Sequence, residues 1–218
     1  MNGVWGVVPV KCFGRGKSRL ADVLSAPARE VLARELCEHV LGVLAGCAGI
    51  GGTLVVTDCA GVEELARARG ADVIRDPSEG RLATIADHAL ATLASRGARG
   101  GLVLMSDLPL LGPSDVAALV AGLDQAPVVL APDLRDAGTN ALGLAPPDAM
   151  RTCFGSETSF DLHVARAREA SLPVFVHRSE GTGRDLDSPE DLGALAAYGD
   201  RGARLSWKRN RSSRVRAA

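Results

Sequence analysis

Aromatic residues are scarce in this sequence, with Phe 4, Trp 2 and Tyr 1 among 218 residues. Modules that bind single-stranded nucleic acid stack several bases on exposed rings, so the composition argues against such a module. The remaining composition, with 46% hydrophobic and 23% charged residues and a mean hydropathy of +0.10, is that of an ordinary globular protein. We expect no nucleic acid among its partners.

Long hydrophobic runs are also absent. No apolar segment approaches the roughly 18 residues that span a bilayer. The short run Val4–Val10 leads directly to Lys11 without a small-residue cleavage site, so it does not have the form of a signal peptide. These absences predict a soluble, cytoplasmic protein that does not act on a membrane.

Cysteine is present in an odd number, 5, and no pair has C-x-x-C spacing. The residues are Cys12, Cys37, Cys47, Cys59 and Cys153. This pattern is typical of reduced thiols in a cytoplasmic protein, where most of them pack as small apolar groups. The sequence therefore predicts free thiols.

The formal net charge of −1 conceals an asymmetry. Residues 201–218 contain 7 cations and no acid, which leaves 18 cations and 26 acids, a net charge of −8, in residues 1–200. We expect residues 1–200 to form a single domain and residues 201–218 a solvated, flexible tail. The alternative is contact of this tail with RNA or a membrane, which predicts salt-dependent RNA binding that is lost on truncation.

Short β-branched segments alternate with longer Ala/Leu-rich segments of helical periodicity, which favours an α/β fold with a mostly parallel central sheet flanked by helices. The expected strands are Val4–Val10, Thr53–Thr57, Asp72–Arg75, Gly101–Met105, Val128–Ala131, Leu142–Leu144 and Val174–His177. The first expected helix begins near Pro27 behind Ser25 and ends at Gly49–Gly52. The others are Val62–Arg69, Leu82–Ser95, Asp115–Leu123 behind a Ser114 cap, Phe160–Ala170 and Pro189–Tyr198.

In such a sheet, ligands bind beyond the carboxyl ends of the strands. Three expected turns at this edge, Lys11–Arg19, Ser106–Pro109 and Arg184–Asp187, carry most of the unusual polar residues. The first resembles a P-loop, but the Walker pattern requires a glycine where Lys11 stands. Its cations at positions 11, 15, 17 and 19 can still bind phosphate together with backbone N–H groups, although a solvated basic loop is the alternative.

The other two turns supply carboxylates. Asp107 follows an apolar strand, where it can face a cleft, and Asp185 and Asp187 share a face in extended chain. Mg²⁺ takes one or two carboxylates together with phosphate oxygens, so these three acids are candidate metal ligands. The alternative for Asp187 is that it only caps the helix that begins at Pro189.

Two polar loops, Asp136–Asn140 and Phe154–Phe160, offer hydroxyl and glycine groups that could receive an anionic substrate, although turn formation explains their composition equally well. His163 lies four residues after Ser159 on the same expected helix face. The spacings of a Ser/His/Asp triad or of zinc ligands are absent from the sequence.

Several segments together resemble one enzyme family. They are Trp5–Lys11, Lys17–Leu20, Ser106–Pro109, Gly138–Asn140, Ser159-Phe-x-x-His163 and Asp185–Leu192. In this order, over about residues 4–198, the chain resembles the 2-phospho-L-lactate guanylyltransferases of coenzyme F-420 biosynthesis, which belong to the molybdopterin-guanylyltransferase-like nucleotidyltransferases. The resemblance implies a Rossmann-like nucleotidyltransferase fold and transfer of GMP from GTP to 2-phospho-L-lactate, phosphoenolpyruvate or 3-phospho-D-glycerate, with release of pyrophosphate.

The resemblance also implies roles for individual residues. Lys11, Lys17 and Arg19 match the GTP-binding segment; Asp107, Asp185 and Asp187 match the Mg²⁺ ligands; Thr139, Gly155 and Ser159 match the acid-binding residues; Lys17 and Asp107 are the expected catalytic pair. The chain departs from the family pattern in the spacing of Gly155 and Ser159, which is four rather than three, so Ser156 or Thr158 could take one of these roles. Leu82-Ala83 also replaces a common Leu-Asn, and Cys12 a frequent proline.

The residues suit such chemistry because a phosphate monoester has a second pKa of about 6 and needs no general base to attack at neutral pH. Positioning and charge neutralisation are then sufficient. Two rivals are nucleotidyl transfer to molybdopterin or a sugar phosphate, and a catalytically inactive nucleotide-binding regulatory protein. The presence of Lys17 and all three acids favours an active enzyme. The sequence leaves open whether the protein forms a homodimer.

Overall fold

A computed structural model describes residues 3–77, 81–198 and 205 of the chain. Its centre is a seven-stranded sheet in the order β3-β2-β1-β4-β6-β5-β7, in which only β6 runs antiparallel to its neighbours. The strands are β1 (Val4–Pro9), β2 (Ile50–Thr57), β3 (Asp72–Arg75), β4 (Gly100–Leu104), β5 (Val128–Pro132), β6 (Thr139–Leu144) and β7 (Val174–Val176). The predicted mostly parallel α/β sheet is confirmed.

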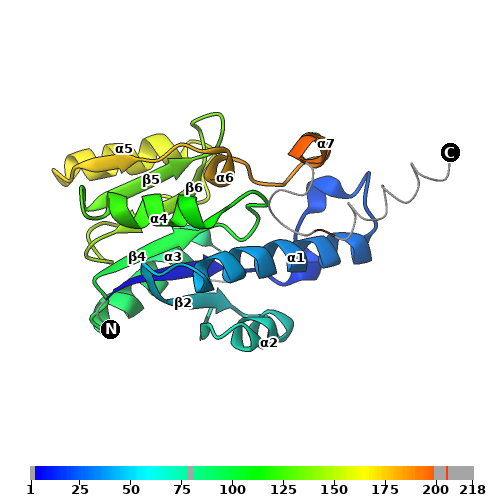
Figure 1. Cartoon of the computed structure of the whole chain (residues 1–218), viewed down its shortest axis with the longest axis horizontal. Coiled ribbons are helices and arrows are strands. Elements are labelled where there is room, and N and C mark those ends of the chain that lie inside the picture. The colour runs from blue at the N-terminus through cyan, green and yellow to red at the C-terminus, as the bar shows by residue number, and fades with distance from the viewer. Residues whose placement is uncertain (1–2, 78–80, 199–204, 206–218) are drawn as a thin grey trace.

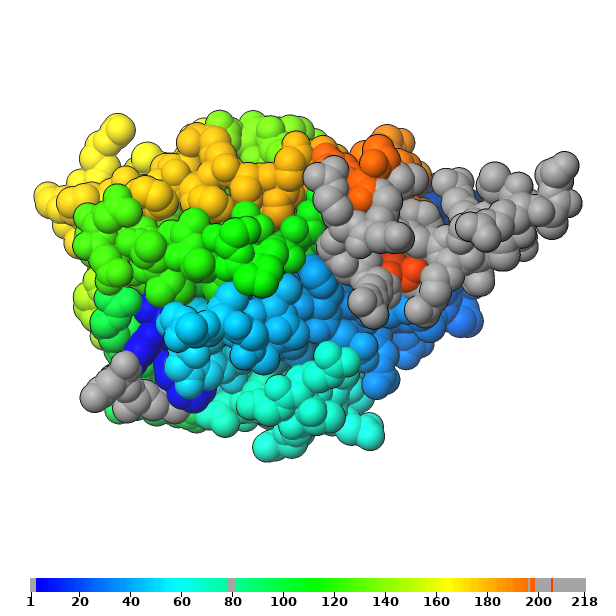
Figure 2. All heavy atoms as spheres, in the orientation of Figure 1, coloured from blue at the N-terminus to red at the C-terminus, as the bar shows by residue number. Residues whose placement is uncertain are grey.

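Helices cover both faces of this sheet (Figure 1). They are α1 (Ala26–Ala45), α2 (Ala60–Ala68), α3 (Leu82–Ser95), α4 (Pro113–Gly122), α5 (Ser159–Glu169), α6 (Glu180–Gly183) and α7 (Pro189–Leu195), with short 3₁₀ turns η1 (Phe13–Arg15), η2 (Ser18–Leu20) and η3 (Ala196–Tyr198). One core cluster joins α1, α2 and α4 to the sheet, and a second joins α3 and α5 to it. Figure 2 shows the face formed mainly by α1 and α4.

A third apolar cluster lies apart from these two cores and joins distant parts of the chain. It contains Leu20, Leu32, Leu36, Leu186, Leu195 and Leu205. Leu20 belongs to η2 and Leu186 to the segment before α7, and both side chains are at most 1% exposed. Burying these side chains together removes apolar surface from water, so the basic turn after β1 is held against the acidic segment 185–187.

Several local predictions need correction. Ser114 does not cap α4: Gly112 occupies the N-cap position, and the Asp115 carboxylate accepts a hydrogen bond from its backbone N–H. The first helix ends at Ala45, with Gly46 as its C-cap, before the glycine-rich stretch, because β2 already begins at Ile50. Strand β6 begins at Thr139, inside the expected polar loop, and α6 was not predicted because four residues carry no helical periodicity.

The predicted tail falls on residues 201–218, of which only Leu205 is described. Leu205 is 2% exposed and packs in the third cluster. Residues 201–204 and 206–218 lie outside the described part of the chain, so the tail stays a prediction. Among the described residues, no helix combines the length and apolarity needed to cross a bilayer.

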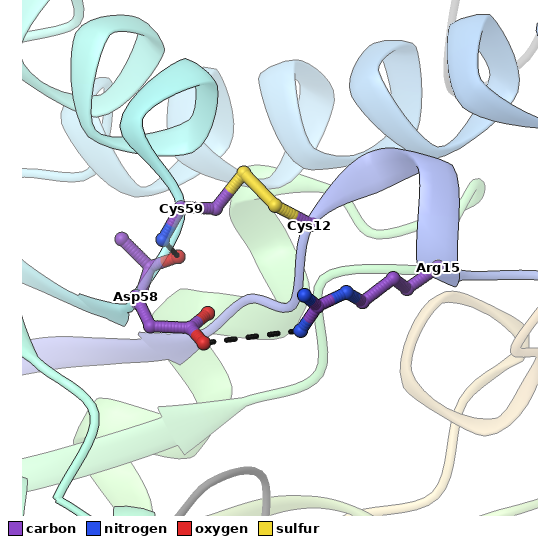
Figure 3. The surroundings of a disulfide bond; sticks show 5 residues. Cys12, Arg15, Asp58 and Cys59 are labelled. Carbon is purple, nitrogen blue, oxygen red and sulfur yellow. Dashed lines mark hydrogen bonds and ion pairs between the residues drawn. A yellow bond between two sulfur atoms is a disulfide. The ribbon is translucent and has the colours of Figure 1, made fainter.

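The prediction of five free thiols is wrong for two of them. Cys12 and Cys59 form a disulfide bond (Figure 3). Cys37, Cys47 and Cys153 are free. The reason is strand register: Pro9 of β1 pairs with Val56 of β2 in parallel, and each cysteine lies three residues beyond its paired position. Two chains that leave adjacent parallel strands together therefore bring thiols 47 residues apart into contact.

This disulfide is expected to stabilise the fold. Because it closes a 47-residue separation, the chain-entropy model predicts a loss of about 4 kcal/mol in the free energy of unfolding for the Cys12→Ser/Cys59→Ser double variant. Urea unfolding at equal pH measures it, with Cys47→Ser, a partly exposed free thiol, as the matched control. Equal unfolding free energies for the double variant and the native protein would contradict the prediction.

Candidate active site

The carboxyl edge of the sheet gathers the polar segments that the sequence singles out. The turn after β1 carries Lys17, the turn after β4 carries Asp107, and the segment between α6 and α7 carries Asp185 and Asp187. The Leu186 backbone N–H donates a 3.1 Å hydrogen bond to the Asp107 carbonyl, which ties the last two segments together. Figure 1 shows α7 beside the turn after β1 at this end of the molecule.

Lys17 is the centre of this arrangement. Its Nζ donates to Asp107 Oδ2 at 2.7 Å and to Asp187 Oδ1 at 2.8 Å, and its side chain is only 8% exposed. The residue has a left-handed backbone, φ 58° and ψ 35°, which is rare outside glycine and costs on the order of 1 kcal/mol. The two ion pairs and the burial of Leu20 hold it there.

Charge fixes the protonation state of Lys17. Burial alone lowers the pKa of its ammonium group, but the charges of Asp107 and Asp187 and their hydrogen bonds outweigh that effect and raise the pKa. Lys17 is therefore cationic at neutral pH. One ammonium group between two carboxylates leaves the trio of Lys17, Asp107 and Asp187 with a net negative charge, which a second cation can offset.

Asp185 is the third carboxylate and lies deeper. Burial raises its pKa to about 6, and the nearby charge of Asp107 acts in the same direction. Asn140 Nδ2 donates to Asp185 Oδ1 at 3.4 Å and to the Thr182 carbonyl at 3.0 Å, linking the start of β6 to α6. Asp185 therefore holds its proton to a higher pH than an ordinary aspartate, because it is buried and close to Asp107 and Asp187.

Asp187 does not cap α7. Ser188 does, in a capping box with Asp191: Asp191 N–H donates to Ser188 Oγ at 3.2 Å, and Ser188 N–H donates to Asp191 Oδ2 at 2.8 Å. The Asp187 carboxylate instead accepts from Lys17. The helix-capping interpretation of Asp187 is therefore replaced by an ion-pair role.

Helix α6 is held close to α4 by a shared carboxylate. Asp115 Oδ1 accepts a 2.6 Å hydrogen bond from Ser179 Oγ, and Asp115 Oδ2 accepts one from Gly112 N–H at 2.9 Å. A Cβ on Gly181 would collide with this carboxylate, so only glycine permits the approach. This packing fixes the position of α6 and therefore of the backbone that leads from α6 to Asp185.

A second cluster lies where β6 meets α5. Thr139 Oγ1 accepts from Ser159 Oγ at 3.3 Å and lies 3.0 Å from Nδ1 of His163, and all three residues are buried. The residues around the irregular spacing of Gly155 and Ser159 differ in their surroundings. Ser156 and Thr158 are exposed and hydrogen-bond each other, so Ser159 is the residue that meets Thr139.

The remaining expected site residues are not drawn into either cluster. Lys11 and Arg19 are exposed and form no ion pair within residues 3–77, 81–198 and 205. Gly155 is exposed with φ +92°, a backbone conformation that favours glycine, and nothing lies near where its Cβ would be. The sequence alone assigned no role to Asn140 or His163. Asn140 could have been identified, because it belongs to the Gly138–Asn140 segment that carries part of the family resemblance.

The three carboxylates at this edge supply only part of the ligand shell of a divalent ion. In the described part of the chain no three Asp, Glu, His or Cys side chains gather into a complete metal site. Asp107 and Asp187 nevertheless share one cation, the Lys17 ammonium group, and both raise the pKa of Asp185. Mg²⁺ commonly takes one or two carboxylates and completes its shell with water and phosphate oxygens. The donor set fits such an ion in the company of a phosphate ligand.

Comparison with known proteins places these observations in a family. The family model "Guanylyl transferase CofC like" matches residues 5–214. The chain is 38% identical over 200 residues to a phosphoenolpyruvate guanylyltransferase of Sphaerobacter thermophilus, covering 90% of this chain and 94% of that protein. It is 34% identical over 194 residues to a 2-phospho-L-lactate guanylyltransferase of Methanothermobacter thermautotrophicus, covering 89% and 84%.

Solved structures agree at the level of fold. A protein of Desulfovibrio desulfuricans G20, provisionally described as a nucleotide-diphospho-sugar transferase, superposes with a TM-score of 0.82 at 19% identity, covering 100% of this chain and 98% of that one. The Rossmann-like nucleotidyltransferase fold expected from the resemblance is confirmed. With the matched residues extending across both clusters, the chain belongs to the CofC-like guanylyltransferase family.

Proposed function

We propose that this protein transfers GMP from GTP to a phosphorylated three-carbon acid and releases pyrophosphate, the reaction implied for coenzyme F-420 biosynthesis. The observation that carries the proposal is family membership along 5–214 together with a buried cation, Lys17, seated between two carboxylates at the carboxyl edge of the sheet. Phosphoenolpyruvate is the first acid to test, because it is named in the relative with 38% identity.

The reaction forms one P–O bond and breaks another. A phosphate oxygen of the acid attacks the α-phosphorus of GTP, and the bond from that phosphorus to the bridging oxygen breaks, so pyrophosphate leaves with the electron pair. The attacking phosphate is already ionised near neutral pH. The protein's task is to bring anions together in line and to offset their repulsion.

The residues divide this task. Lys17 provides positive charge to the departing pyrophosphate, and the exposed Lys11 and Arg19 on the same turn bind the outer phosphates. Asp107 and Asp187, with Asp185 behind them, would hold Mg²⁺. When bound, that ion supplies charge neutralisation to phosphate oxygens of the nucleotide.

The acid is assigned to the second cluster. Thr139 and Ser159 place two hydroxyl groups beside each other at the start of β6 and of α5. Gly155, four residues before Ser159, has a positive φ of 92°. Because β6 is antiparallel to β4, its first residues lie at the same edge as Asp107. Asn140, next to Thr139, reaches Asp185 and links the acid-binding cluster to the carboxylates.

The test is an assay of pyrophosphate release by the purified protein with GTP, Mg²⁺ and each of three acids: phosphoenolpyruvate, 2-phospho-L-lactate and 3-phospho-D-glycerate. We expect release with at least one acid, and none when the acid is omitted. Replacing GTP with CTP or ATP measures nucleotide selectivity in the same assay. Absence of release with all three acids would overturn the proposed function.

A further inference from the structure

A buried chain of hydrogen bonds runs behind the proposed acid-binding hydroxyl groups. The backbone N–H of Cys153 donates to His163 Nε2 at 2.7 Å, His163 Nδ1 lies 3.0 Å from Thr139 Oγ1, and Ser159 Oγ donates to Thr139 Oγ1 at 3.3 Å. His163 is 0% exposed, so its ring is shielded from bulk solvent. Phe154 packs edge-on against its ring at a centroid distance of 4.9 Å, which further limits ring rotation.

The first link of this chain fixes the tautomer of His163. A backbone N–H can only donate, so Nε2 of His163 must be the unprotonated nitrogen. Burial lowers the pKa of His163 to about 4, and the ring is therefore neutral at neutral pH. Its single proton is on Nδ1, which lies 3.0 Å from Thr139 Oγ1 and donates toward it, with the Ser159 backbone carbonyl as a second acceptor for the same N–H.

The proton count at the two hydroxyl groups follows from that tautomer. Thr139 Oγ1 accepts from His163 Nδ1 and is hydrogen-bonded to Ser159 Oγ. Thr139 and Ser159 own two hydroxyl protons, and their mutual bond uses one. In the opposite tautomer, Nδ1 has no proton and accepts the second hydroxyl proton. Neither hydroxyl group of the Thr139–Ser159 pair could then donate to a ligand. Fixing Nδ1–H therefore keeps one hydroxyl proton available for another acceptor.

We propose that His163 is a positioning residue that holds the Thr139–Ser159 pair as a hydrogen-bond donor to an anionic oxygen of the acid substrate. Carboxylate and phosphate oxygens of such an acid only accept hydrogen bonds, so their site must present donors. His163 acts through Thr139 and does not touch the substrate itself. The inference rests on the proposed function, in which the acid lies against Thr139 and Ser159.

Two substitutions of His163 distinguish the contributions of its two ring nitrogens. His163→Asn can keep a donor near the position of Nδ1, whereas His163→Gln reaches toward the position of Nε2 and leaves Thr139 without its donor. We expect His163→Gln to raise the KM for the acid by about 10- to 100-fold, as for loss of one hydrogen bond to a charged group, with the KM for GTP within about 3-fold. We expect His163→Asn to raise the KM for the acid less than His163→Gln does.

The double variant gives a sharper criterion. Thr139→Val removes the hydroxyl group with little change in shape and is expected to raise the KM for the acid similarly. Adding His163→Gln to Thr139→Val should cause no further increase, because both changes remove the same donated proton. Multiplicative effects of the two substitutions, or an equal rise in the KM for GTP, would overturn the inference by showing a general structural role.

One measurement uses the native protein and requires neither a folded variant nor enzymatic activity. Long-range ¹H–¹⁵N correlation spectra of ¹⁵N-histidine-labelled protein at pH 7 distinguish the two neutral tautomers, and we expect His163 to carry its proton on Nδ1. A proton on Nε2 would overturn the inference even if the enzyme is active. An inactive native protein with all three acids would instead overturn the proposed function, and the inference with it.

Discussion

Replacing Lys17 with methionine is expected to lower kcat/KM for GTP by about 10²- to 10³-fold, the loss typical of removing one preorganised group that stabilises charge in a transition state. Methionine keeps the apolar stem of a side chain that is only 8% exposed, so the change removes charge more than packing. Steady-state pyrophosphate release measures the loss. A value within about 3-fold of the native protein at saturating Mg²⁺ would contradict a catalytic role for Lys17.

The same variant should also respond differently to Mg²⁺. In the native protein the Lys17 ammonium group occupies the space between Asp107 and Asp187, and without it the two carboxylates lack a cation. Added Mg²⁺ should then raise the Tm of Lys17→Met more than that of the native protein. Arg99→Met is the matched control, because it removes an ion pair of equal length, 2.7 Å, at the amino end of β4.

Asp107→Asn is expected to have the second largest effect, a loss in kcat of about 10²-fold or more and a shift of the Mg²⁺ dependence to higher concentration. Asparagine keeps the size of the side chain and removes its charge. Lys17 retains Asp187 at 2.8 Å, so the fold should persist, which circular dichroism can verify. Titration of activity with Mg²⁺ at saturating GTP separates weaker metal binding from slower transfer.

The control for this substitution is Asp124→Asn, which neutralises the aspartate that pairs with Arg99 at the other end of β4. That aspartate follows α4 and is 64% exposed, and its partner Arg99 lies at the end of β4 opposite to Asp107, so turnover and Mg²⁺ dependence should both stay near native values. If Asp107→Asn matches Asp124→Asn in both properties, Asp107 neither binds the metal nor supports transfer.

Local pattern was enough to predict most of the elements. Helix α3 and strand β3 have the predicted bounds, Leu82–Ser95 and Asp72–Arg75, because hydrophobic periodicity is a property of neighbouring residues. The exceptions share a cause. The four-residue α6 is too short to show a helical period. Strand β6 begins at Thr139 because residues with the composition of a turn pair with the neighbouring strands β5 and β4.

The candidate site divides in a similar way. Lys17, Asp107 and Asp187 were identifiable from the chain because each follows an apolar segment that ends at one edge of the sheet. Their ion pairs were not, because they require Leu20 and Leu186 to pack in the same cluster. The competing interpretation of Asp187 as a helix cap was settled by the capping box of Ser188 and Asp191.

Residue types and their order along the chain thus established the α/β class, the basic turn, the acidic strand ends and the family. Three features arise only when distant segments meet: the Cys12–Cys59 bond, the seating of Lys17 between two carboxylates, and the tautomer of His163. Each depends on strand register or on burial of side chains many residues apart. No local pattern encodes those distances, because they are set by the packing of the whole chain.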